Sequence, residues 1–133
     1  CEAGLLPGAL LLNDHQKFAC KNTYIKSDNT LTAISKEVSG NVLNIPIAHG
    51  EGRFYADEAT MNELESNQQV IFRYCDKSGD TTKDNPNGST HNIAGICNAG
   101  RNVFGMMPHP ERACSNMLGN TDGLKIFNSL IHN

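Results

Sequence analysis

Apolar residues along the chain follow two spacings, and the first of these predicts strands. Residues 18–26 (FACKNTYIK) mix aromatic and β-branched side chains and precede a polar turn at residues 27–30. Residues 42–48 (VLNIPIA) predict a second strand, in which Pro46 removes a backbone donor. We therefore expect Pro46 on an edge strand or at the end of a strand, directly before the glycine-flanked loop at residues 49–52.

Three further strands are expected in the second half of the chain. Residues 70–75 (VIFRYC) have side chains that alternate with the period of a strand. Residues 91–97 and 102–107 predict two more strands, joined by the turn at residues 98–101. Residues 76–90 lie between these segments and are polar and rich in Gly, Asn and Asp. A loop of this length in a compact domain is often functional.

Helical spacing predicts a short helix in the middle of the chain. Asp57 can cap this helix, and the helical pattern continues to Asn67. Met61 and Leu64 lie three residues apart and therefore share one face. We expect that face to be buried.

A second helix is expected from about Asp122 towards the end of the chain. Thr121 or Asp122 can act as its cap, and Leu124, Phe127 and Ile131 share one apolar face. Strands interspersed with helices predict a three-layer α/β domain with some antiparallel pairing. The sequence contains no internal repeat and no sign of a second domain.

Composition and charge argue against several classes of function. The chain has 133 residues, of which 38% are hydrophobic, and a net charge of −3 with scattered Lys and Arg, so we expect no nucleic-acid-binding surface. No apolar run approaches the roughly 18 to 20 residues that a transmembrane helix needs, which predicts a soluble, cytoplasmic protein without a membrane contact. Five cysteines without a CxxC spacing predict neither a disulfide framework nor a zinc site.

The most specific chemical pattern is Pro108-His109-Pro110-Glu111. Each proline pushes the residue before it into an extended conformation, and side chains two apart in an extended stretch point the same way. We therefore expect Glu111 to accept a hydrogen bond from one ring nitrogen of His109, which leaves the other nitrogen free to act as a base. On spacing alone, the alternative is a surface His and Glu in a proline-stiffened turn.

A base of this kind serves a nucleophile, and two cysteines are candidates. Residues 95–100 (GICNAG) approach the GxCxG pattern of a nucleophile elbow, but they depart from it at Ala99 and precede a strand. Cys97 is therefore interpreted as a hairpin residue. Cys1 could attack with its own α-amino group as base. Its context, CEAG followed by LLPG, is instead typical of a helix end, which predicts that the domain begins upstream of this chain.

A metal site is a further alternative. His49-x-Glu51 and His109-x-Glu111 share the HxE spacing of zinc deaminases. Those enzymes also need a PCxxC segment, which this sequence lacks. No metal ligands are therefore assigned.

Longer motifs occur here in the order in which one enzyme family has them. They are PIAHGEGRFYADE (46–58), FRYCD (72–76), NPNGS (85–89), IAGICN (93–98) and GMMPHPER (105–112). With these motifs the chain resembles, over essentially its whole length, the glutaminase subunit of phosphoribosylformylglycinamidine synthase. This family consists of glutamine amidotransferases with a Cys-His-Glu triad.

The resemblance implies a flavodoxin-like, three-layer class I glutamine amidotransferase domain. Residues 1–133 correspond to the C-terminal part of this single domain, which is thus expected to be incomplete at its N-terminus. A cysteine thiolate is implied to attack the side-chain amide of glutamine. His109 then shuttles the proton, and Glu111 orients His109.

The resemblance also implies which residues lie near the substrate. The loop that contains His49, Gly50 and Glu51 matches a segment that lines the glutamine pocket of related amidotransferases. These three residues are therefore the substrate-binding candidates. Residues 85–89 either border the same pocket or face the partner subunit, and the sequence leaves both readings open.

Partners follow from the same resemblance. Ammonia is expected to pass to a large synthetase subunit that uses ATP and Mg²⁺ to amidate formylglycinamide ribonucleotide in purine biosynthesis, with a small accessory subunit as a further partner. No cofactor is expected in this chain. Because the family's nucleophile precedes the matching region, the chain alone is expected to be inactive. The alternatives are a non-catalytic module that binds the large subunit, and an N-terminal-nucleophile hydrolase that uses Cys1.

Overall fold

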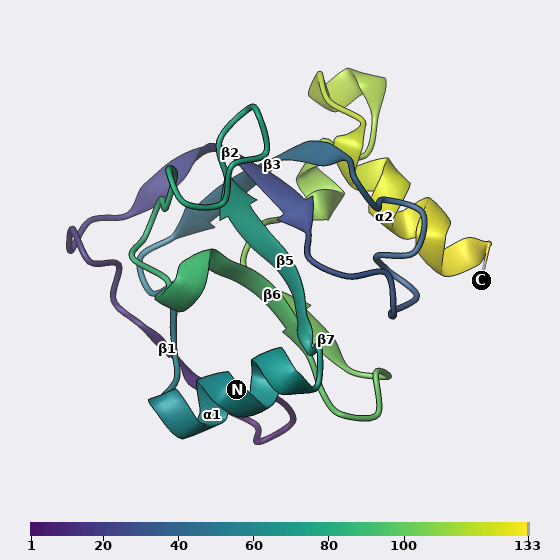
Figure 1. The fold of residues 1–133 in the computed structure, drawn as a ribbon. Helices are drawn as coiled ribbons and strands as arrows, with labels where there is room; N and C mark the ends of the chain where they lie inside the picture. Colours follow the sequence, from purple (N-terminus) through teal and green to yellow (C-terminus); the bar gives the residue numbers. More distant parts are fainter. Residues whose placement is uncertain (133) are drawn as a thin grey trace.

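A curved, five-stranded sheet forms the centre of the computed structural model, which describes residues 1–132 (Figure 1). All neighbouring strands in this sheet are antiparallel. Across the sheet the strands are β3 (Val42–His49), β2 (Ala19–Ser27), β5 (Val70–Cys75), β6 (Ile93–Cys97) and β7 (Phe104–Met106). Two short strands, β1 (Ala9–Leu11) and β4 (Arg53–Tyr55), form a separate antiparallel pair.

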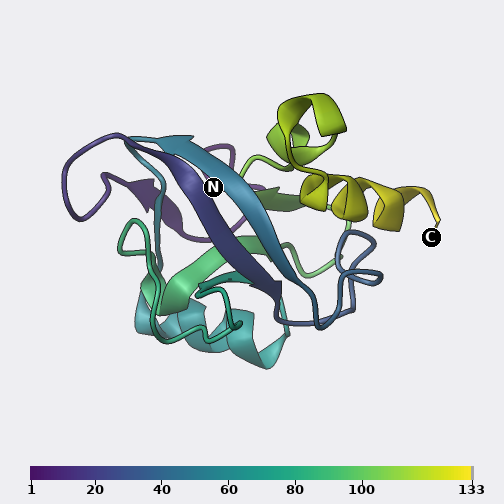
Figure 2. The ribbon, with the colours of Figure 1, turned by 90° about the horizontal axis from the view of Figure 1, so that it is seen from above.

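Helices lie on both sides of the sheet, which gives the layers that the sequence predicts (Figures 1 and 2). The helix α1 (Glu58–Ser66) packs in one apolar cluster through Met61 and Leu64, and α2 (Asp122–Ile131) packs in another through Ile126. Three 3-10 turns complete the chain: η1 (Thr90–Asn92), η2 (Pro110–Ala113) and η3 (Asn116–Leu118). No helix among residues 1–132 is long and apolar enough to cross a bilayer.

The predicted strands β2, β3 and β5 are confirmed to within one residue at each end. Pro46 lies in β3, which is an edge strand, as its missing donor predicts. Every second residue of β3 is buried, from Leu43 to His49. The buried face of this edge strand therefore ends at His49, at the start of the 49–52 loop.

The hairpin of β6 and β7 is also confirmed, but the prediction that a strand begins at residue 91 is wrong. His91 and Asn92 adopt left-handed backbone conformations, with φ of 50° and 57°, inside and at the end of η1. The side-chain amide of Asn92 donates to the carbonyls of Thr81 and Asp84, at 2.8 and 2.9 Å. Asn92 thus holds the long loop against the sheet, and β6 begins one residue later.

Both predicted helices are present, and the cap of α1 is confirmed. The carboxylate of Asp57 accepts a hydrogen bond from the Thr60 amide at 2.8 Å. Met61 and Leu64 are 4% and 1% exposed, so the predicted buried face is correct.

The helix α2 turns a different face to the core from the one that the sequence predicts. Leu124 and Ile131 are 40% and 74% exposed, whereas Gly123, Ile126 and Ser129 are buried. A Cβ atom on Gly123 would collide with the Pro110 carbonyl, and the Ser129 hydroxyl donates to the Ala33 carbonyl at 2.6 Å. Ile126 therefore shares the buried face with small and polar residues that contact backbone, whereas Leu124 and Ile131 lie on the exposed side.

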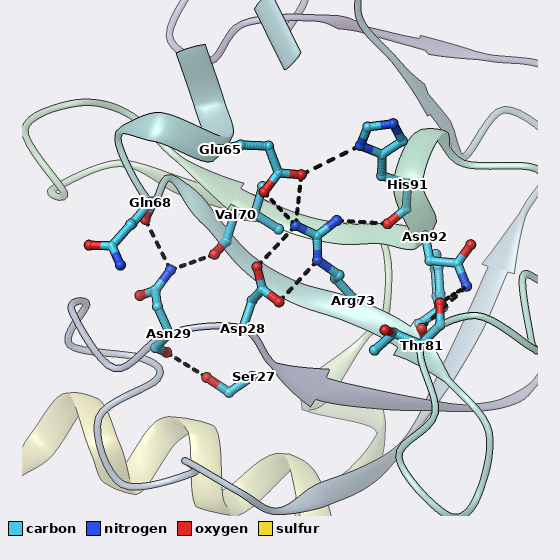
Figure 3. Close-up of polar contacts among 11 residues, drawn as sticks. Ser27, Asp28, Asn29, Glu65, Gln68, Val70, Arg73, Thr81, His91 and Asn92 are labelled. Carbon is cyan, nitrogen blue, oxygen red and sulfur yellow. Dashed lines mark hydrogen bonds and ion pairs between the residues drawn. The ribbon is translucent and has the colours of Figure 1, made fainter. Parts of the chain in front are cut away.

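Arg73 on β5 ties four segments together (Figure 3). Its guanidinium donates to both carboxylate oxygens of Asp28 at 3.0 Å, to those of Glu65 at 2.8 Å and to the His91 carbonyl at 2.8 Å. Burial opposes the charge of Arg73, but the two carboxylates outweigh it and raise the pKa of Arg73. The cluster fastens α1 and η1 to the sheet.

Candidate functional site

His109 and Glu111 lie side by side after β7. The Nδ1 atom of His109 is 2.8 Å from Oε1 of Glu111, which confirms the predicted hydrogen bond. The backbone route differs from the expected one, because Glu111 is not in an extended stretch. Pro110 starts the 3-10 turn η2, and that turn brings the carboxylate back to the ring of His109.

This hydrogen bond assigns roles to the two ring nitrogens of His109. A carboxylate only accepts, so Nδ1 of His109 carries a proton, and in the neutral ring the lone pair lies on Nε2. Among residues 1–132, no group forms a hydrogen bond with that Nε2 atom. The side chains of His109 and Glu111 are 32% and 57% exposed. The pair is therefore a base with an open nitrogen at the surface of this part of the chain.

The backbone of His109 fixes the pair to the edge strand. Its amide donates to the Pro46 carbonyl of β3 at 2.8 Å. Three residues further along β3 is His49, and the charge of His109 is one of the influences on the pKa of His49. The predicted base and the predicted substrate-side loop thus lie at the same end of β3.

His49 itself is enclosed, with 8% of its surface exposed. Its Nδ1 atom is 3.0 Å from Oδ1 of Asn13, and its Nε2 atom is 3.4 Å from Nδ2 of Asn87. Burial lowers the pKa of His49, and the nearby charges of His109 and His15 lower it further. The ring therefore has both nitrogens occupied and favours the neutral state.

The other two substrate-side candidates are more open. The carbonyl of Gly50 accepts a hydrogen bond from the Asn13 amide at 2.9 Å, and the remaining backbone of Gly50 is half-buried. Glu51 is exposed, and its carboxylate has no hydrogen bond or ion pair within residues 1–132. Of the three candidates, Glu51 has the side chain that is available to a ligand.

Residues 85–89 border the 49–52 loop. The side-chain amide of Asn87 donates to the Gly52 carbonyl at 2.8 Å. The backbone carbonyl of Asn87 accepts a hydrogen bond from the backbone amide of Asp14 at 3.1 Å. Asn85 holds the turn from within, because its Oδ1 accepts from the Gly88 amide at 2.9 Å. The NPNGS segment is therefore a support for the 49–52 loop.

Asn13 and Asn87 are the residues of this region that sequence reasoning missed. Asn87 lies within the NPNGS motif, but nothing in the motif shows which of its residues reaches His49. Asn13 follows a run of apolar residues in a polar stretch, where an asparagine is ordinary turn chemistry. Their role depends on contacts between residues more than 30 positions apart, which local pattern does not reveal.

The cysteines differ in how well they could serve as nucleophiles. Burial raises the pKa of Cys97, and it raises that of Cys75 to about 11, so both thiols resist ionisation. The Cys1 thiol donates to the Pro7 carbonyl at 3.4 Å. Within residues 1–132, no cysteine sulfur bonds to His109, and no group of three or more His, Cys, Asp or Glu could hold a metal ion.

Comparisons with known proteins agree with this fold. The family model for the CobB/CobQ-like glutamine amidotransferase domain matches residues 6–127. Phosphoribosylformylglycinamidine synthase subunit PurQ from Gloeobacter violaceus is 53% identical over 132 residues, and PurQ from Aquifex aeolicus is 49% identical. Both alignments cover 98% of this chain, but 57% and 58% of the relatives, so the chain spans little more than half of their length.

A solved structure gives the same result in three dimensions. The structure of PurLQS from Thermotoga maritima contains a chain that is similar to this one with a TM-score of 0.80 and 41% sequence identity. The match covers 98% of this chain and 55% of that one. It confirms the expected amidotransferase fold class and the resemblance drawn from the motifs. The chain therefore belongs to the family of CobB/CobQ-like glutamine amidotransferase domains.

Proposed function

We propose that residues 1–133 are the C-terminal part of a single glutaminase domain that supplies ammonia to phosphoribosylformylglycinamidine synthase in purine biosynthesis. The observation that carries the proposal is the His109–Glu111 pair, with Nδ1 tied to the carboxylate at 2.8 Å and Nε2 open. The pair lies at the end of β3 from which the 49–52 loop leaves. A base and a substrate loop thus share one edge of the sheet.

In the proposed reaction, His109 acts on a cysteine thiol and on the side-chain amide of glutamine. Nε2 of His109 removes the thiol proton, and the thiolate forms a bond to the amide carbon. The same proton passes to the leaving nitrogen, so that ammonia departs and a thioester remains. His109 then removes a proton from water, and the water oxygen bonds to the thioester carbon. The C–S bond breaks to release glutamate, and His109 returns the proton to the cysteine sulfur. Glu111 holds the ring and stabilises its charge.

The nucleophile is assigned to the part of the relatives that this chain does not span. Among residues 1–132, no thiol contacts Nε2 of His109, and burial holds Cys97 in its neutral form. Gly50 and Glu51 are proposed to meet the glutamine. The exposed carboxylate of Glu51 can form an ion pair with the α-ammonium group of glutamine. A backbone group of Gly50 can form a hydrogen bond with a polar atom of glutamine.

The proposed partner is a large synthetase subunit that uses ATP and Mg²⁺. The Thermotoga maritima relative is part of an assembly called PurLQS. By analogy with it, this chain is proposed to work with the synthetase subunit and a small accessory subunit in the cytoplasm. The ammonia released from glutamine would then be consumed by the synthetase subunit of the same complex.

The test joins this chain to the part of the Gloeobacter violaceus PurQ that the match does not cover, and adds the large subunit from that organism. Glutamate release from glutamine and glutamine-dependent amidation of formylglycinamide ribonucleotide are measured. We expect both activities. His109→Ala is expected to lower glutamate release by about 10³-fold or more, since loss of a triad member typically costs orders of magnitude.

Two further variants sharpen this test. Glu111→Gln is expected to lower the rate by at least about tenfold, because the neutral amide orients and stabilises the ring less well. Glu63→Gln, an exposed change on α1, is the matched control and should leave the rate unchanged. A complex that assembles but releases no glutamate would favour the non-catalytic binding module. Full activity of His109→Ala would refute the proposed base.

A further inference from the structure

We propose that His49 is a positioning residue, fixed as the neutral Nδ1–H tautomer between Asn13 and Asn87, and that this three-residue clamp sets the shape of the 49–52 loop. The ring of His49 is 8% exposed, and both of its nitrogens face a side-chain amide. A ring enclosed in this way does not reach a ligand with either nitrogen.

The orientation of the Asn13 amide follows from its other partners. Its Nδ2 atom lies 2.8 Å from the carbonyls of Lys17 and His49, which can only accept. Oδ1 must therefore be the atom that faces the Gly52 amide at 3.2 Å and Nδ1 of His49 at 3.0 Å. An acceptor opposite Nδ1 requires that Nδ1 of His49 carries the proton.

The Asn87 amide is fixed by the same reasoning. Its Nδ2 atom donates to the Gly52 carbonyl at 2.8 Å, and its Oδ1 atom accepts from the Ser89 amide at 3.1 Å. Nδ2 of Asn87 is then the atom 3.4 Å from Nε2 of His49, so Nε2 must accept. If either side-chain amide were rotated by 180°, its NH₂ group would face a donor or its oxygen would face an acceptor. Together they select one neutral tautomer and exclude the protonated ring, which has no acceptor on its Nε2 side.

Gly52 closes the clamp. Its amide is bound by Asn13 and its carbonyl by Asn87, so both of its backbone groups are held. A Cβ atom at this position would overlap the ring of His49, so only glycine permits the ring to lie against the backbone. The two ends of the loop, His49 and Gly52, are thus held together, and the exposed side chain of Glu51 lies between them.

The functional part of the inference rests on the proposed glutaminase activity. If Gly50 and Glu51 meet glutamine, the clamp determines where they stand, and the loop acts without a substrate contact from the imidazole. Loss of the clamp should then weaken glutamine binding more than it slows the chemistry at His109, which has its own partner in Glu111.

The tautomer is tested directly by nitrogen NMR of the histidine rings in the ¹⁵N-labelled 133-residue chain at pH 7. We expect His49 to show a protonated Nδ1 and an unprotonated Nε2. His15 and His109 are the titratable groups whose charge acts on His49, so their resonances are followed in the same titration. A protonated Nε2, or a ring that is charged at pH 7, would overturn the inference.

A change of one amide to a carboxylate provides an independent measurement. Asn87→Asp replaces the donor opposite Nε2 by an acceptor, so the doubly protonated ring becomes favourable. We expect the NMR titration midpoint of His49 to rise by roughly one unit or more. Asn62→Asp, an exposed change on α1, is the matched control and should leave the midpoint unchanged. An unchanged midpoint in Asn87→Asp would also overturn the inference.

Two substitutions of His49 test the clamp in the joined enzyme described above. Asn at position 49 can place an amide N–H where Nδ1–H lies, whereas Leu cannot. We expect His49→Leu to raise the KM for glutamine at least tenfold with kcat within about threefold, and His49→Asn to recover most of this loss. Equal effects of both substitutions, or a loss in kcat alone, would contradict the clamp. Absence of glutaminase activity in the unmutated enzyme would refute the proposed function and leave the NMR result standing.

Discussion

A single proline decides where the carboxylate of Glu111 lies. Sequence pattern predicts the contact with His109 correctly, since two prolines restrict the segment to few conformations. It does not predict the local backbone. Pro110 occupies the first position of a 3-10 turn, for which its fixed φ is suited, and the turn replaces the expected extended path. The pairing could be predicted because both backbone routes bring the same two side chains together.

His49 shows the opposite case at the same scale. Its motif indicates a place beside the substrate, but the structure gives the ring two asparagine partners and little exposure. A buried imidazole with satisfied nitrogens cannot be distinguished by sequence from an exposed ligand group. The distinction depends on Asn13 and Asn87, which come from distant loops.

The buried neutral state of His49 predicts how stability depends on pH. Because its folded pKa lies below the ordinary value of 6.5, the unfolded chain binds a proton here that the folded chain does not. Its contribution is fully present above pH 6.5 and is lost as the pH falls from there towards the lowered pKa. Each unit of separation between the two pKa values costs about 1.4 kcal/mol.

Chemical denaturation of the chain between pH 7.5 and 5 measures this effect. We expect the free energy of unfolding to fall with pH more steeply in the unmutated chain than in His49→Asn, which has no proton to gain. Parallel pH profiles of the two proteins would show that His49 does not titrate on unfolding.

At the scale of elements, strands were easier to predict than the face of a helix. Residue composition located β2, alternation located β5, and the donor missing from Pro46 favoured an edge position or strand end, of which β3 shows the edge position. For α2, the large apolar residues suggested a face that the structure leaves exposed. Gly123 determines the face through a close approach to the Pro110 carbonyl, and close backbone approach is not a property of hydrophobic pattern.

Substitutions on the two faces of α2 test this orientation. Ile126→Ala is expected to lower the free energy of unfolding by about 2–5 kcal/mol, because it removes a side chain that is 2% exposed. Leu124→Ala, at a position 40% exposed, is expected to cost less than about 1 kcal/mol. Denaturant titration gives both values. A larger loss of unfolding free energy for Leu124→Ala than for Ile126→Ala would show that α2 buries the face predicted from the sequence.

Gly123→Ala probes the contact between α2 and the turn that carries Glu111. The added methyl group collides with the Pro110 carbonyl, so α2 and η2 must move apart. We expect a loss of about 1–3 kcal/mol in stability, measured by thermal or denaturant unfolding. We also expect a change in the NMR signals of the His109 ring, since η2 positions its partner. Unchanged His109 signals would show that the turn does not depend on α2.

The Arg73 cluster joins segments that lie far apart in the sequence. Arg73 on β5 binds Asp28 after β2, Glu65 on α1 and the carbonyl of His91 in η1 (Figure 3). A lone Arg in an apolar strand predicts little by itself. Its planar group can meet two carboxylates in paired hydrogen bonds, a geometry that an ammonium group cannot reproduce.

Arg73→Lys should therefore be costly although it keeps the charge. We expect a loss of about 1–3 kcal/mol in the free energy of unfolding, because one ammonium group cannot reach all three partners. Arg112→Lys, at a side chain 53% exposed with a 3.8 Å contact to Glu111, is the stability control and should change it by less than about 0.5 kcal/mol. Equal losses in the two variants would show that the paired geometry of Arg73 contributes nothing.

The hydrogen bond from the His109 amide to the Pro46 carbonyl also has a kinetic consequence. Contacts between distant positions in a chain form late, because the intervening segment must first be ordered. His109 should thus reach its place beside Pro46 only when the edge strand docks, and a nascent chain that ends before residue 109 lacks this contact. Pulse-labelled hydrogen exchange during refolding should show the His109 amide gaining protection together with β3, so that the placement of the proposed base is a late event in the maturation of this fold.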